Sequence, residues 1–174
     1  DIGLAGKIWA HTAATETGIG ANFYYDGAYK RIAANAATRY IQDGNGHTFD
    51  VAASSTAGST ISSWTTAMTI DASGNLLVGG TSTNPTGQNV AGAAIDASGE
   101  GNFSVAGAEA LRLNRKTSDG TIVNFMKDGA TVGGIGNNTD FYIASQDGTG
   151  VRFSATQVLP CSESGATQNG SRDL

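Results

Sequence analysis

Carboxylates are the side chains in this sequence that could support catalysis, because two of them held about 5–10 Å apart can hydrolyse a glycosidic bond. Most of the Asp residues, however, stand in Asp-Gly dipeptides or in the two Asp-Ala-Ser-Gly stretches that begin at Asp71 and Asp96. In such turns the Asp side chain accepts hydrogen bonds from nearby backbone. The glutamates stand apart from one another in the sequence, at Glu16, Glu100, Glu109 and Glu163. We therefore predict structural turns and no catalytic residue.

Motifs for cofactors and metals are incomplete. Five Gly-x-Gly triplets occur, but none has a further glycine three residues later and no Gly-Lys-Ser/Thr triplet is present, so a nucleotide-binding loop is not predicted. The lone Cys161 excludes a disulfide framework and a cysteine-based zinc site. His11 and His47 are isolated, although three symmetry copies of one histidine could hold an ion. We expect no cofactor and no metal.

Aromatic residues are densest around the dipeptide Asp26-Gly27. Phe23, Tyr24, Tyr25 and Tyr29 flank it, and strand alternation places Phe23 and Tyr25 on one face and Tyr24 on the other. A tyrosine ring with its hydroxyl suits stacking on a sugar at a shallow surface. Tyr24, Tyr25 and Tyr29 are therefore the candidate contacts for a glycan, and packing in the core is the alternative.

Charge and hydropathy exclude two classes of partner. The chain has 10 Lys and Arg against 15 Asp and Glu, and its one basic cluster is Arg112, Arg115 and Lys116, whereas nucleic-acid binding needs clustered positive charge. No run of 18 apolar residues is present, so no membrane insertion is predicted. The first residues lack the pattern of a signal peptide, and the start at Asp1 suggests a fragment of a longer polypeptide.

The elements that must position these residues are short strands joined by turns. Strands of four to seven residues are predicted at 22–25, 29–32, 38–42, 47–51, 67–70, 75–78, 93–96, 102–106, 110–114, 121–127, 131–135, 141–144 and 150–154. Asp-Gly favours the centre of a two-residue hairpin turn. The predicted turn residues are Asp26, Gly27, Asp43, Gly44, Asp71, Gly74, Asp96, Gly99, Asp119, Gly120, Asp128, Gly129, Asp147 and Gly148.

The composition predicts an all-β chain that does not complete its own core. Gly, Ala, Ser, Thr and Asn make up more than half of the 174 residues, and Leu, Ile, Val and Phe only 32. A thin sheet made from such a chain leaves one face of its apolar side chains wet unless a second surface covers it. The stretch 81–90, which contains Pro85, is the predicted linker between an N-terminal segment, 1–80, and a C-terminal segment, 91–174.

The C-terminal half resembles a known family. The stretch Ala110–Gly136, with its Asp-Gly turns, is similar to the hairpin module in tail fibres and tailspikes of tailed bacteriophages, which commonly precedes an intramolecular chaperone of the endosialidase type. The stretches Gly150–Phe153, Leu159–Cys161 and Arg172–Leu174 resemble the segment that follows this module. Asp71–Gly79 is similar to another common fibre hairpin, so the resemblance covers about residues 67–174.

This resemblance implies a fibrous, hairpin-rich β-structure completed by three intertwined identical chains. It implies a non-enzymatic virion protein in an extracellular tail appendage, which positions host-cell recognition. The partners would be two further copies of the chain, other virion tail proteins, and a host cell-surface glycan or protein. The alternatives are a tailspike fragment that degrades polysaccharide and a bacterial adhesin stalk. No catalytic residue of the family carries over to this chain.

Overall fold

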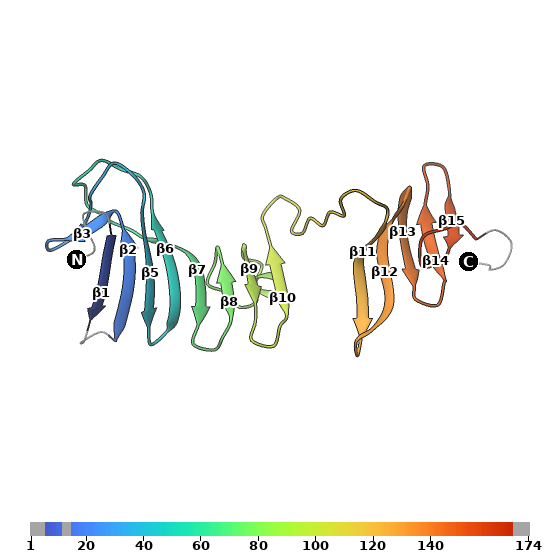
Figure 1. Cartoon of the computed structure of the whole chain (residues 1–174), viewed down its shortest axis with the longest axis horizontal. Coiled ribbons are helices and arrows are strands. Elements are labelled where there is room, and N and C mark those ends of the chain that lie inside the picture. The colour runs from blue at the N-terminus through green and yellow to red at the C-terminus, as the bar shows by residue number, and fades with distance from the viewer. Residues whose placement is uncertain (1–5, 12–14, 169–174) are drawn as a thin grey trace. The chain divides into compact units, whose positions relative to one another are not determined.

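The computed structural model describes residues 6–11 and 15–168, and within them the chain is almost entirely antiparallel β-structure (Figure 1). The prediction of an all-β chain is confirmed. The chain divides after Ala110 into two compact units, which are described separately below. The predicted linker at 81–90 is therefore wrong as a boundary, because β8 and β9 on either side of it pair in one sheet.

Unit 1 contains an eight-stranded sheet in which the strands follow the chain in order, except for a short hairpin that stands outside the sheet. The sheet strands are β1 (Gly6–His11), β2 (Glu16–Ala21), β5 (Ala37–Asp43), β6 (Gly46–Ala52), β7 (Thr65–Asp71), β8 (Leu76–Val78), β9 (Gly92–Ile95) and β10 (Gly101–Ser104). The separate hairpin is β3 (Phe23–Tyr25) with β4 (Tyr29–Arg31). Each neighbouring pair is antiparallel, including the pairs joined by longer loops, such as β6–β7 and β8–β9.

The one helix among the described residues is α1 (Pro85–Gln88), in the loop between β8 and β9. Asn84 caps it by accepting a hydrogen bond from the Gly87 N–H (2.8 Å), and a proline at the start of a helix loses no hydrogen bond. The Pro85 ring is buried and α1 packs on β9 and β10. The predicted linker thus covers one end of the sheet.

Unit 2 is a five-stranded antiparallel meander. Its strands are β11 (Gly120–Lys127), β12 (Ala130–Asn138), β13 (Asp140–Ser145), β14 (Gly150–Phe153) and β15 (Val158–Cys161). Three strands of the chain, β1, β2 and β15, were not among those predicted. Conversely, the predicted strand at 110–114 is wrong for the single chain, because no strand lies between Ser104 and Gly120.

The turn between β11 and β12 is the two-residue turn that the sequence predicts. Asp128 (φ 50°) and Gly129 (φ 80°) lie between the paired residues Lys127 and Ala130. Two positive φ angles in succession give the turn whose twist matches that of the flanking strands. No atom lies within 4 Å of the position that a Cβ on Gly129 would occupy, so only the backbone conformation restricts this site.

A longer turn occurs four times among the described residues. In each, the first residue accepts a hydrogen bond from the N–H of a glycine three positions later, and its own N–H donates to the carbonyl four positions later. That glycine has positive φ, which suits a residue without Cβ. The turns begin at Asp71, Asp96, Ser145 and Ser162 and contain Gly74, Gly99, Gly148 and Gly165. Asp147-Gly148 therefore ends such a turn and does not form the centre of a two-residue one.

The predicted turn at Asp43-Gly44 is wrong by one residue. Asp43 pairs with Gly46, so the two turn residues are Gly44 and Asn45. The Asp43 carboxylate accepts a hydrogen bond from the Asn45 N–H (2.8 Å), and Gly46, at the end of the turn, has a φ of 122°. The register of β5 and β6, rather than the dipeptide, decides where the chain reverses.

The core of each unit lies on one face of its sheet. In unit 1 the buried side chains Phe23, Ala37, Ala52 and Ile61 pack with Trp9, Tyr29 and Trp64. The rings of Trp9 and Phe23 occupy the positions that Cβ atoms on Gly18 and Gly20 would take, so these two glycines of β2 let the rings lie on the backbone. In unit 2 the buried residues are Tyr142, Ala144 and Cys161.

A buried arginine fastens the loop that covers the core of unit 1. Arg31 is 6% exposed, and its guanidinium donates to the carbonyls of Ala53 (3.1 Å) and Thr60 (3.2 Å) and to the Ser59 hydroxyl (3.3 Å). These acceptors satisfy a cation that would otherwise be costly to bury. The loop after β6 is therefore held against the β3–β4 hairpin.

We expect Gly129→Val to destabilise unit 2 by about 1–2 kcal/mol, because a β-branched residue is strained at positive φ. Gly129→Asn is the matched control, since it also adds a side chain in open space but tolerates this conformation. Urea unfolding followed by circular dichroism would measure both. Equal stability of the two variants would contradict a turn with positive φ at Gly129.

Candidate functional site

An apolar row of side chains crosses the whole sheet of unit 1 on the face opposite the core. Residues directly opposite one another in antiparallel neighbours point to the same face. The strand registers place in one line Ile8, Ile19, Tyr40, Phe49, Met68, Val78, Ala93 and Phe103, one from each strand. Ile8 is 58% exposed and Ile19 53% exposed, and Phe49, Val78 and Phe103 are also exposed. This set is called the apolar row below.

The face around the apolar row carries no formal charge at neutral pH. The registers place only neutral side chains in the two flanking lines, among them Thr38, Val51 and Ile70, and no Asp, Glu, Lys or Arg. Over β2, β5 and β6 the face is hollowed by about 690 Å³, and side chains that line this hollow include Ile19 and Phe49. A continuous apolar surface of this kind marks an interaction site on a soluble protein.

Unit 2 has a similar face. The registers align Val123, Ile135, Ile143, Val151 and Pro160 across all five strands. Two residues away in the same strands, Phe141 lies opposite Phe153, with ring centroids 5.6 Å apart. Ile143 and both phenylalanines are exposed. Each unit therefore has one covered face and one apolar face that the described residues of that unit leave open.

The three candidate glycan contacts lie in the β3–β4 hairpin but in different environments. The turn Asp26-Gly27, where Gly27 has a φ of 103°, lies in the loop that joins Tyr25 to its partner Tyr29. Tyr29 packs edge-on against Phe23 at 5.6 Å and belongs to the core cluster. Tyr24 is 38% and Tyr25 58% exposed, so these two rings are accessible.

Phe23 and Tyr25 are alternate residues of β3, but their burial differs. Phe23 is 2% exposed because it reaches the sheet, whereas Tyr25 lies beyond the sheet at the tip of the hairpin. Beside them Lys30 forms an exposed ion pair with Asp26 (2.9 Å), and this contact raises the pKa of Lys30. An exposed pair of this kind adds little to stability.

A polar cluster next to the core was not anticipated from the sequence. Arg39 on β5 pairs with the buried Asp50 carboxylate (2.9 Å), which also accepts a hydrogen bond from the Thr66 hydroxyl (2.8 Å). The Arg39 guanidinium lies 4.4 Å from the ring centroid of Trp64, a cation–π geometry. These contacts lock three strands together on the covered face.

The carboxylates of the two Asp-Ala-Ser-Gly turns serve the turns themselves. Asp71 accepts hydrogen bonds from the Asn75 side chain (2.8 Å) and backbone (2.9 Å), and the Asn75 hydrogen bonds lower the pKa of Asp71. Asp96 accepts bonds from Ser98 and from the Glu100 N–H, and its pKa is lowered, chiefly by the Ser98 hydroxyl. Asn75 also accepts a hydrogen bond from the Ala97 N–H (3.0 Å), which joins the two turns.

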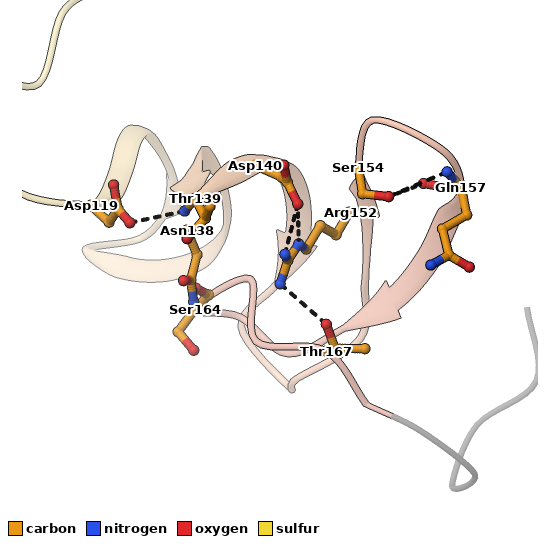
Figure 2. A network of polar contacts seen from close by, with 9 residues as sticks. All are labelled: Asp119, Asn138, Thr139, Asp140, Arg152, Ser154, Gln157, Ser164 and Thr167. Atoms are coloured by element: carbon orange, nitrogen blue, oxygen red, sulfur yellow. Dashed lines mark hydrogen bonds and ion pairs between the residues drawn. The ribbon is translucent and has the colours of Figure 1, made fainter.

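Asp119 and Asp140 belong to the polar network of unit 2 (Figure 2). The predicted turn at Asp119-Gly120 is wrong, because Gly120 already pairs with Asn137 as the first residue of β11. The Asp119 carboxylate instead accepts the Thr139 N–H (2.9 Å), at the tight connection of β12 and β13. The Oδ2 atom of Asp140 accepts hydrogen bonds from both Nη2 and Nε of Arg152 on β14 (2.6 and 3.0 Å), and the opposite charges strengthen these bonds.

The same network fastens the end of the described chain to the sheet. Arg152 donates to the Thr167 hydroxyl (3.1 Å) and Asn138 donates to the Ser164 carbonyl (3.0 Å). Both acceptors lie in the segment after β15, and Gly165 in this segment lies against the Tyr142 ring. The carboxylates thus support the covered face. The resembling stretch Arg172–Leu174 lies outside the described residues.

The described histidine and cysteine side chains have neighbours of their own within the fold. In the described part of the chain no three His, Cys, Asp or Glu side chains gather as a possible metal site. The His47 Nδ1 atom lies 2.6 Å from the Tyr40 hydroxyl, and the two rings stack. The side chain of His11 lies outside the described residues. Burial raises the pKa of the Cys161 thiol, which disfavours the reactive thiolate.

No family model matches the chain, and no curated protein or solved structure matches it either. No helix among the described residues is long and apolar enough to span a membrane.

We expect Asn75→Ala to raise the pKa of Asp71 toward its ordinary value of 3.8, because the variant removes the side-chain hydrogen bond to the carboxylate. Ser98→Ala is the matched variant for Asp96 and should raise the pKa of Asp96. A lowered pKa in the folded state stabilises the fold above pH 3.8, and this stabilisation is lost as the pH falls through the lowered value. Carboxyl-carbon NMR titration measures both groups, and unchanged titrations would contradict these roles.

Proposed function

We propose that this chain is a non-enzymatic structural segment of a tailed-bacteriophage tail fibre, which assembles as a homotrimer and positions host-cell recognition. The observation that carries the proposal is the apolar row, which spans all eight strands of unit 1 and has no cover from the described residues of that unit. The resemblance of Ala110–Gly136 to phage fibre hairpins supports the location in a virion and the assembly of three copies.

Burial of the apolar row supplies the driving force for assembly. A large apolar side chain that becomes fully buried contributes about 1.5–3 kcal/mol. Ile8, Ile19, Phe49, Val78 and Phe103 are 38–58% exposed in the single chain, so covering each of them would yield about half of such a contribution. This gain is comparable to the net stability of an ordinary small domain.

The chemistry of the face favours a second copy of the chain as the cover. The row runs along the middle of the long strands, and its flanking lines are neutral, so like faces can meet without burying charge. In a closed ring of copies every face has a partner. The same reasoning applies separately to the aligned residues of unit 2.

The accessible surface of the proposed fibre suits weak, repeated contacts. Tyr24 and Tyr25 are exposed beyond the covered face and lie away from the apolar row. A single tyrosine pair binds a sugar weakly, but three copies per fibre and several fibres per particle strengthen attachment. The fibre would thus sit in an extracellular tail appendage, joined to other virion tail proteins and directed at a host glycan or protein.

We expect Ile19→Asp to abolish or strongly weaken the trimer, because it places a charge in the middle of the proposed interface. Tyr25→Asp is the matched control, since Tyr25 is equally exposed but lies outside the sheet. Light scattering should give three times 17.6 kDa for the parent chain and for Tyr25→Asp. A folded monomer of the parent chain, or identical behaviour of both variants, would refute the proposal.

For glycan binding we expect weak signals on an array of bacterial surface polysaccharides, reduced by Tyr25→Ala and unchanged by Tyr29→Phe, which keeps the packed ring. The trimer should release no reducing ends from these polysaccharides, because the turn carboxylates bind backbone N–H groups of their own turns. Release of reducing ends by the purified chain would replace the structural proposal with an enzymatic one.

A further inference from the structure

The segment Ala110–Asn114 has the pattern of a strand, but none of the described strands pairs with it. Leu111 and Leu113 alternate with polar residues, and both side chains are exposed, Leu111 by 59% and Leu113 by 52%. Among the described residues, no backbone–backbone hydrogen bond is made by the N–H or C=O of Leu111 or Leu113. These two leucines therefore leave both apolar surface and backbone groups open to a partner.

An edge suited to this segment exists on β11. Among the described strands β11 pairs with β12 alone, so its other side presents unpaired backbone groups. Val123 and Phe125 lie two residues apart on the open face of unit 2. A strand added at this edge would place Leu111 and Leu113 beside them with the same two-residue period.

Pairing within the same chain is opposed by Arg115. This residue begins the loop between the segment and β11, and its guanidinium donates to the carbonyls of Ser118 (2.9 Å) and Thr121 (3.2 Å). Thr117 in the same loop has a φ of 88°. The guanidinium therefore occupies the start of the open edge, where the returning strand of a simple hairpin would lie.

We propose that Ala110–Asn114 forms a strand with β11 of a neighbouring copy. This inference rests on the proposed self-association and specifies one of its contacts. Each copy donates one segment and receives one, so a closed ring leaves no segment unpaired. Leu111 and Leu113 then extend the aligned apolar residues of unit 2, and the open edge of β11 disappears.

Hydrogen exchange of the assembled full chain, read by NMR or mass spectrometry, tests the pairing. We expect alternate amides within Leu111–Asn114 to exchange at least about 100-fold more slowly than the amide of Gly107 in the exposed bend upstream. Ile143, on a strand with neighbours on both sides, provides the protected reference. Free exchange throughout the segment in a chain of trimer mass would overturn this inference and leave the proposed function intact.

Cysteine cross-linking shows whether the partner is another copy. Chains with Leu113→Cys and chains with Phe125→Cys, refolded together, should oxidise to a product of twice 17.6 kDa. Leu113→Cys with Phe141→Cys is the control pair, because Phe141 is as exposed as Phe125 but lies on β13. A chain that carries both Leu113→Cys and Phe125→Cys tests pairing within one copy. If the amides are protected but only this chain forms the disulfide, within itself, the pairing of strands between copies is overturned. A monomeric parent chain would overturn the proposed function as well.

Discussion

A sheet one layer thick has two faces, and this chain has large side chains on both but covering loops for only one. In unit 1 the β3–β4 hairpin, the loop held by Arg31 and helix α1 all lie on the same side. Gly18 and Gly20 allow the aromatic rings of that side to lie close to the backbone. The isoleucines and phenylalanines of the opposite face remain exposed, so this face has apolar surface to offer to a partner.

Much of the strand and turn pattern follows from local sequence. Alternation identifies β5, β6 and β11, and Asp128-Gly129 adopts the expected turn because both residues tolerate positive φ. The strands β1 and β2 are not predicted, because their Ala and Gly residues show no alternation of apolar and polar side chains. The role of Gly18 and Gly20 becomes clear only from the structure, in which aromatic rings pack on them. Local patterns also predict the wrong turn residues at Asp43 and Asp119. At Asp43 the register of β5 and β6 decides the turn, and the Asp119 carboxylate instead accepts a hydrogen bond from the distant Thr139.

The candidate site is less readable from the sequence than the fold. The apolar row becomes visible only when eight registers are known, because its members come from eight strands and no two are near neighbours in the sequence. The predicted tyrosines illustrate a related limit. Tyr25 and Tyr29 are paired across one hairpin, yet Tyr29 packs against the core and Tyr25 is exposed. The difference arises because Trp64 and Phe23 pack against Tyr29.

The two identical Asp-Ala-Ser-Gly turns have a consequence for how such a chain changes length. If Asp71 were joined directly to Ala97, β8 and β9 would be removed and β7 would pair with β10 through the same turn. The strand register would be kept, because Ile70 and Ile95 each directly precede the Asp of their turn. Met68 would then lie opposite Phe103. The sheet would shorten by two strand spacings, about 10 Å. Recombination between such turns can therefore add or delete whole hairpins while the line of apolar residues remains unbroken.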